Sequence, residues 1–79
     1  MGALHQVEIV VHVDDVLAQE QQAGLISDLE KHTGVEKAHF TPGRKHLLVV
    51  DYDPDKLNAQ EVLKFVQREH IGAELVGPI

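Results

Sequence analysis

The first apolar segment of the chain alternates with a period of two. Its most regular apolar positions are Val7, Ile9, Val11 and Val13. This period is typical of a β-strand, because successive side chains of a strand point to opposite faces of the sheet. Asp14 and Asp15 follow, and either carboxylate can accept a hydrogen bond from the first backbone N–H groups of a helix. The sequence therefore predicts a strand and then a helix.

Helical spacing replaces the alternation over residues 17–33. The apolar positions at this spacing are Ala18, Leu25, Ile26 and Leu29. Gly34 follows them, and glycine readily adopts the left-handed conformation that ends a helix. Gly24 lies inside the expected helix, where glycine costs roughly 1 kcal/mol relative to alanine. We interpret Gly24 as a point of close packing against the sheet.

A hairpin is expected after the first helix. Its first strand has Val35, Ala38 and Phe40 along one face. Pro42-Gly43 suits the centre of a type II turn, because proline fixes the first dihedral angle and glycine supplies the positive one. The next strand is predicted over Lys45–Tyr52. One of its faces carries Leu48, Val50 and Tyr52, and the other carries Leu47, Val49 and Asp51.

The last third of the chain predicts a second helix and a fourth strand. Asp53-Pro54-Asp55 ends the preceding strand. Asn58 then starts a helix, with Glu61 three residues later in a capping-box arrangement. The helical positions that follow are Val62, Phe65, Val66 and Glu69. The fourth strand begins with Ile71, Ala73 and Leu75.

This order of elements, βαββαβ, indicates an α+β fold of the ferredoxin-like kind, with one domain over residues 1–79. Right-handed crossovers place the strands in the antiparallel order 4-1-3-2, with both helices on one face. The other face would carry an apolar strip formed by Val10, Leu47, Val49 and Val76. Such a strip commonly marks a surface for a partner protein or a second copy. Strands also tolerate scattered exposed valines, so both interpretations stay open.

The composition removes several classes of function. There is no cysteine, which excludes disulfides, thiolate metal sites and thiol nucleophiles. Thirteen acidic residues against seven Lys and Arg give a net charge of −6, so we expect no nucleic-acid partner. Apolar runs such as residues 47–50 are too short to span a bilayer. Because the N-terminus lacks the pattern of a secretory signal, we expect a soluble cytoplasmic protein without a membrane partner.

The sequence contains no recognisable catalytic constellation. Ser27 is the only serine and lies in the middle of the first expected helix, without a neighbouring base. Asp53 and Asp55 flank Pro54, which favours a turn over a pair of catalytic carboxylates. We therefore expect a protein that is not an enzyme.

Six histidines are the unusual feature of the composition. His12, Asp14 and Asp15 are a candidate metal site, because imidazole and carboxylate ligands suit Cu(II), Ni(II) or Zn. The alternative is that the aspartates cap the helix and His12 is a solvated strand residue. His39 shares a face with His12 at two strand spacings, about 9–10 Å, which is wide for one ion. His46 lies beside the turn and is expected to be exposed. No other cofactor is indicated.

Three segments of the chain match sequence patterns of one known family. They are Thr33-Gly34-Val35, the run from Val50 to Lys56, and the run from Glu61 to Lys64 with Ile71 after it. Together they resemble the heavy-metal-associated domains, a family that includes copper chaperones and the N-terminal modules of metal-pumping ATPases. The resemblance extends from about Val7 to Val76, and it implies the same ferredoxin-like fold.

The metal-binding motif of that family is missing here. Counted back from Gly34 without gaps, the two metal-binding cysteines of the family fall on Ala18 and Gln21, and its Gly-Met falls on Asp15 and Val16. Neither Ala nor Gln supplies the thiolate pair that holds a soft ion. His70 stands where the family usually has a glycine, and histidine tolerates a positive φ better than most residues. The resemblance therefore implies the fold without metal transfer by thiolates.

The sequence leaves three hypotheses about function. The first is a non-enzymatic accessory module that binds a second copy of itself or a larger partner through the open sheet face. The second is a Cu, Ni or Zn binding or transport protein that uses histidine and aspartate ligands. The third is a small-molecule sensor similar to the amino-acid-sensing ACT domains, which share this topology. An RNA-binding domain of the same topology is excluded, because the open face carries no aromatic side chain for stacking.

Overall fold

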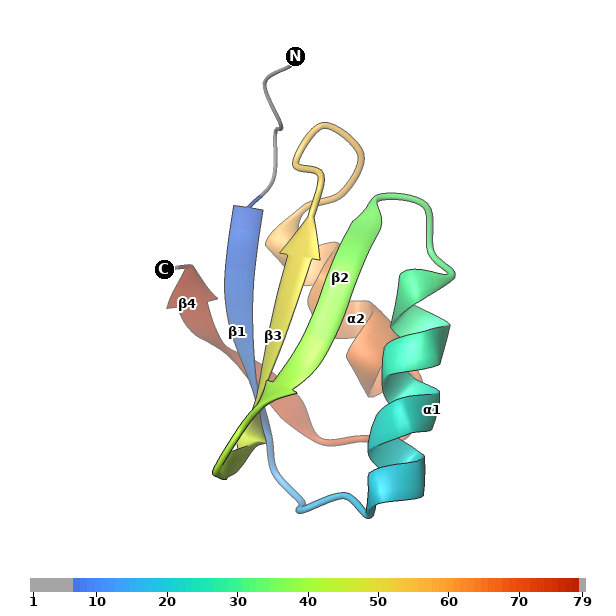
Figure 1. Ribbon diagram of the computed structural model, residues 1–79. Helices are drawn as coiled ribbons and strands as arrows, with labels where there is room; N and C mark the ends of the chain where they lie inside the picture. Colours follow the sequence, from blue (N-terminus) through green and yellow to red (C-terminus); the bar gives the residue numbers. More distant parts are fainter. Residues whose placement is uncertain (1–6, 79) are drawn as a thin grey trace.

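The computed structural model describes residues 7–78, and Figure 1 shows the arrangement of its elements. In chain order these are β1 (Val7–Val13), α1 (Gln19–Glu30), β2 (Val35–Thr41), β3 (Arg44–Tyr52), α2 (Ala59–Gln67) and β4 (Ala73–Pro78). The two ends of the expected domain over residues 1–79 lie outside the described residues. No helix between residues 7 and 78 is long and apolar enough to cross a membrane.

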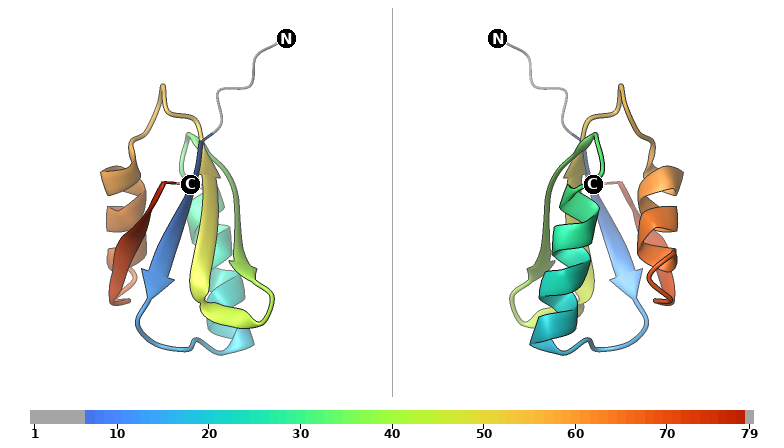
Figure 2. Two further views of the ribbon diagram at one scale, coloured as in Figure 1. Left: turned by 90° about the vertical axis from the view of Figure 1, so that its left-hand side faces the viewer. Right: turned by 90° about the vertical axis from the view of Figure 1, so that its right-hand side faces the viewer.

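The four strands form one sheet in the order β2-β3-β1-β4, and each neighbouring pair is antiparallel. This is the predicted order 4-1-3-2 read from the other edge, so the predicted ferredoxin-like fold is confirmed. Both helices lie on the same side of the sheet (Figure 1). The β1–α1 loop and the turn of the β2–β3 hairpin lie at the same end of the molecule (Figure 2). Residues far apart in the sequence therefore meet at that end.

The core lies between the sheet and the helices, and the alternation in the sequence sets its composition. The fully enclosed side chains are Ile9, Val11 and Val13 of β1, Leu48 and Val50 of β3, Leu29 of α1, and Val62 and Val66 of α2. Full burial of one such side chain stabilises the fold by roughly 1.5–3 kcal/mol. No buried polar or charged residue occurs among the described residues. Packing of mainly aliphatic side chains holds the layers together.

A β-bulge explains the uneven spacing of apolar residues in β2. The register against β3 shifts between Val35 and Lys37. The extra residue lets Val35 and Ala38 both enter the core although they are three positions apart. The prediction that Val35, Ala38 and Phe40 share one face is confirmed, with Phe40 packed against the edge of the core.

The turns and the second helix follow their sequence signals. Gly34 has φ +105° and Gly43 has φ +76°, which are values that favour glycine. At the start of α2, the Glu61 backbone N–H donates to the Asn58 Oδ1 at 2.9 Å, and the Asn58 N–H donates to the Glu61 Oε1 at 3.0 Å. The predicted capping box is therefore confirmed.

The start of α1 differs from its prediction. The helix begins at Gln19, and the N-cap is Ala18 rather than Asp14 or Asp15. The Ala18 backbone N–H donates to the Gln21 Oε1 at 2.9 Å. The aspartates lie too early, because the chain first has to cross from the sheet to the helix layer and place Leu17, which is only 8% exposed, in the core.

The interpretation of Gly24 is also wrong. This glycine is exposed, and a Cβ built on it would meet nothing within 4 Å. Close approaches to glycine occur instead at Gly72 and at Gly34, where a Cβ would lie 2.9 Å from the Leu57 side chain. The spacing of apolar residues indicates which face of a helix is buried. It does not indicate whether a glycine in that helix contacts the sheet.

Candidate functional site

The positions of the family's metal ligands lie at the first turn of α1. Ala18 contributes a methyl group, and the Gln21 side-chain oxygen already accepts the Ala18 N–H. An amide oxygen suits hard cations, whereas monovalent copper requires soft ligands such as thiolate or thioether. The residues at this corner do not fit a soft ion, as the sequence predicted from Ala18 and Gln21.

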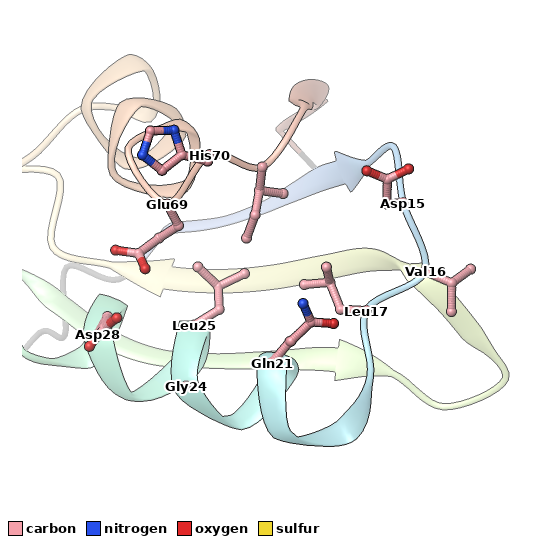
Figure 3. Close-up of a pocket in the computed structure, with 10 residues that line it drawn as sticks. Asp15, Val16, Leu17, Gln21, Gly24, Leu25, Asp28, Glu69 and His70 are labelled. Carbon is pink, nitrogen blue, oxygen red and sulfur yellow. The ribbon is translucent and has the colours of Figure 1, made fainter.

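A pocket of 490 Å³ lies beside this corner, between α1 and the end of α2 (Figure 3). Leu17, Leu25 and Ile71 supply apolar lining, while the acidic lining residues are Asp15, Asp28 and Glu69. His70 also lines the pocket and has φ +62°, as expected for a residue at the family's glycine position. The volume is within the range of small-molecule sites, and the acidic side chains favour cationic over anionic ligands. The hypothesis of a small-molecule sensor stays a prediction.

Two of the three predicted metal-site residues lie together. The His12 Nδ1 is 3.6 Å from the Asp14 Oδ1, and their side chains are 41% and 60% exposed. The His12 Nδ1 itself is enclosed and makes no hydrogen bond to any described residue. Asp15 lines the pocket on the helix side of the loop. Among residues 7–78, no group of three His, Asp or Glu side chains is placed to hold a metal ion.

His46 is the residue at this end that sequence reasoning missed. Contrary to the expectation of an exposed side chain, it is half-buried. Its Nδ1 lies 2.8 Å from the Val13 carbonyl oxygen. Its ring also stacks on that of His12, with centroids 5.6 Å apart and planes 8° from parallel. The signal that could have found this contact is the strand register. Because His12 pairs with Leu47, His46, the residue before Leu47, lies close to Val13.

The other described histidines lie apart from this pair. His39 is exposed on β2 and pairs with Val49 of β3, so that a strand separates it from β1, as predicted. The His32 ring stacks on Phe65, with centroids 3.7 Å apart and planes 4° from parallel. His32 thus contributes to the packing of the end of α1 against α2, which is a structural role.

The residues of the predicted apolar strip belong to β1, β3 and β4. Val10 pairs with Val49, and His12 pairs with Leu47, across β1 and β3. Val10, Leu47 and Val49 are partly exposed, whereas Val76 on the edge strand β4 is 61% exposed. Val16, at the family's methionine position, is the other strongly exposed large apolar residue among the described residues, at 58%.

Comparison with known proteins links this architecture to metal-handling domains. No protein-family model matches the chain, and no curated protein matches it in sequence. A copper binding domain from HMA7, a P-type ATPase, has a TM-score of 0.81 at 18% identity, over 91% of this chain and 96% of that chain. The fold is that of the heavy-metal-associated domains.

Two further structures with the heavy-metal-associated fold agree over most of their length. The N-terminal domain of a potential copper-translocating P-type ATPase from Bacillus subtilis, in its Cu(I)-loaded state, has a TM-score of 0.80 at 15% identity, covering 94% of this chain and 91% of that chain. The Cu(I)-loaded first domain of the human copper chaperone for SOD1 has a TM-score of 0.77 at 18% identity, covering 94% and 97%. At these identities the likeness concerns the fold, and chemistry has to be argued from the residues of this chain.

Proposed function

We propose that the protein is a non-enzymatic accessory module in a metal-handling context, which acts by protein contact through the open face of its sheet. The heavy-metal-associated fold extends over the described chain, and structures that share it include copper-binding domains of ATPases and a copper chaperone. Ala18 and Gln21 stand in place of the thiolates. A module of this kind retains the surface for protein contact without binding a soft ion at Ala18 and Gln21. A cytoplasmic location is part of the proposal.

The open face is the observation that carries this proposal. Both helices cover the opposite side of the sheet (Figure 1). Val10 and Val49 form a cross-strand pair at the centre of the open side, and Leu47 lies two residues before Val49 in β3, opposite His12. Val76 extends the apolar strip onto β4, where it is 61% exposed. Apolar side chains that continue across neighbouring strands are typical of an interaction surface.

A second copy of the chain is the first occupant to test. A two-fold interface places the same apolar strip on both sides. Each strip would then be covered by that of the partner, and every contact would occur twice. A domain of 79 residues has a small core, and association adds to its stability by mass action. Charged residues at the rim, such as Glu8 and Asp51, which pair across β1 and β3, would stay in contact with water.

Sedimentation equilibrium of the untagged chain, from micromolar to millimolar concentration, tests the proposal together with thermal melts. We expect concentration-dependent dimers and a melting temperature that rises with concentration. Leu47→Asp and Val49→Asp should abolish both effects, since each places a charge in the apolar strip. Lys37→Asp is the matched control on the same face at its β2 edge and should retain the dimer. A monomer at every concentration, with both aspartate variants as stable as the parent, contradicts the proposal.

A further inference from the structure

We propose that His12 and His46 form a binding site for one divalent ion of the Zn²⁺, Ni²⁺ or Cu²⁺ class, with their Nε2 atoms as the protein ligands. The residues belong to β1 and to the start of β3, at the end of the sheet shared by the β1–α1 loop and the β2–β3 turn (Figure 2). The proposal goes beyond the proposed protein-contact function and does not depend on it. It also differs from the ligand set predicted from the sequence, because Asp14 becomes a positioning residue and Asp15 has no part.

The hydrogen bond of His46 leaves one ring nitrogen available. Its Nδ1 lies 2.8 Å from the Val13 carbonyl oxygen. A carbonyl oxygen only accepts hydrogen bonds, so the neutral imidazole must carry its proton on Nδ1. Its Nε2 then presents a lone pair. Metal-binding histidines in proteins are generally held in this way, with the second ring N–H donated to a carbonyl or carboxylate oxygen.

The environment of His12 favours the same tautomer. Its Nδ1 is enclosed, and the nearest charged acceptor is the Asp14 carboxylate at 3.6 Å. An ionised carboxylate accepts but does not donate, so it stabilises the tautomer with the proton on Nδ1. In that tautomer the Nε2 lone pair of His12 is also free to bind an ion. The His46 ring thus has the protonation pattern of a metal ligand, and a slight approach of the Asp14 carboxylate to the His12 Nδ1 would give His12 the same pattern.

The backbone of Asp14 is held by the loop after α2. The Asp14 backbone N–H donates to the Gly72 carbonyl oxygen at 2.8 Å. A Cβ at position 72 would lie 2.5 Å from the Asp14 Oδ2, so the carboxylate occupies space that only glycine leaves open. The backbone hydrogen bond thus places Asp14 next to His12, although its carboxylate caps no helix.

The two rings have to leave their parallel stack before both can bind one ion. Nitrogen–metal bonds of about 2.0–2.1 Å require two nitrogens within about 4.2 Å of each other. The ring centroids are 5.6 Å apart and the rings are nearly parallel, so one ring has to tilt toward the other. His12 can do so, because its side chain is 41% exposed and makes no hydrogen bond to the described residues. Water would complete the coordination, as no third protein ligand is in place among residues 7–78.

Calorimetric titration of the untagged full chain with ZnCl₂ tests the site. We expect one Zn²⁺ per chain with micromolar affinity. His12→Ala and His46→Ala should each weaken binding at least tenfold. His39→Ala, which removes an exposed histidine from the same sheet, is the matched control and should bind like the parent. His46→Gln keeps an N–H donor for the Val13 carbonyl, so it separates loss of the ligand from loss of the local fold.

Two readouts identify the ligand atoms. In nitrogen NMR spectra of the histidine rings, Zn²⁺ should shift the Nε2 signals of His12 and His46 and leave those of His39 in place. Gly72→Ala should weaken binding several-fold, because it displaces the Asp14 carboxylate, while Asp15→Asn should not change it.

Four results would overturn the site: no binding of Zn²⁺ or Ni²⁺, parent-like binding by His46→Gln, equal loss in His39→Ala, or one ion for every two chains. These outcomes are separable from those of the proposed function. A monomeric chain that binds one Zn²⁺ supports the site and contradicts self-association. A dimer that does not bind Zn²⁺ supports self-association and contradicts the metal site.

Discussion

The two helices of this protein begin in different ways. At α2, Asn58 and Glu61 satisfy each other's backbone N–H groups, so a local motif defines the first residue of the helix. At α1, the N-cap is an alanine without any side-chain acceptor, and only the Gln21 oxygen returns to the Ala18 N–H. The start of α1 is therefore fixed chiefly by tertiary packing of the preceding Leu17. The comparison separates a helix start fixed by a local side-chain motif from one fixed by the packing of the preceding loop.

The largest effect is expected from Leu17→Ala. This side chain is 8% exposed and attaches the β1–α1 loop to the core. Its truncation should lower the free energy of unfolding by about 2–4 kcal/mol, since it leaves a cavity as well as removing apolar burial. Urea denaturation followed by circular dichroism measures this loss. A loss below about 1 kcal/mol would mean that packing does not define the start of α1.

A smaller effect is expected from the caps themselves. Asn58→Ala should cost about 1 kcal/mol, because it leaves the Glu61 N–H without its acceptor. Gln21→Ala should cost less, because it removes only the bond to the Ala18 N–H and no N-cap side-chain acceptor. Asp15→Ala, with no capping role, should stay within about 0.5 kcal/mol of the parent. If Gln21→Ala cost as much as Asn58→Ala by the same denaturation measurement, the contrast between the two helix starts would be lost.

The same contrast describes how much could be predicted from the sequence. The strand order, the α2 capping box and the turns at Gly34 and Gly43 follow from local signals and from chirality, and all are present. The prediction of a cap at Asp14 or Asp15 was wrong, because burial of Leu17 places the helix start further toward the C-terminus.

The histidine pair could not be found from local patterns. His12 and His46 are 34 positions apart, and the His46 Nδ1 reaches the Val13 carbonyl only because β1 and β3 adopt one particular register. Hydrophobic alternation gave the faces of both strands but not that register. A single residue of slip would have removed the contact.

The central claim is that the chain retains the heavy-metal-associated fold with the ligand corner at Ala18 and Gln21 empty of thiolates. Restoring them with Ala18→Cys and Gln21→Cys tests it most directly, because residues three apart at a helix start lie on one face and the helix N-terminus favours thiolate. In Cu(I) competition with a chelator under reducing conditions, the double variant should bind one Cu(I) at least a hundredfold more tightly than the parent. The control is Gln19→Cys with Gln22→Cys, which has the same spacing but lies one residue further along the helix and therefore on another face. Equal binding by both double variants, or none by either, would contradict the claim.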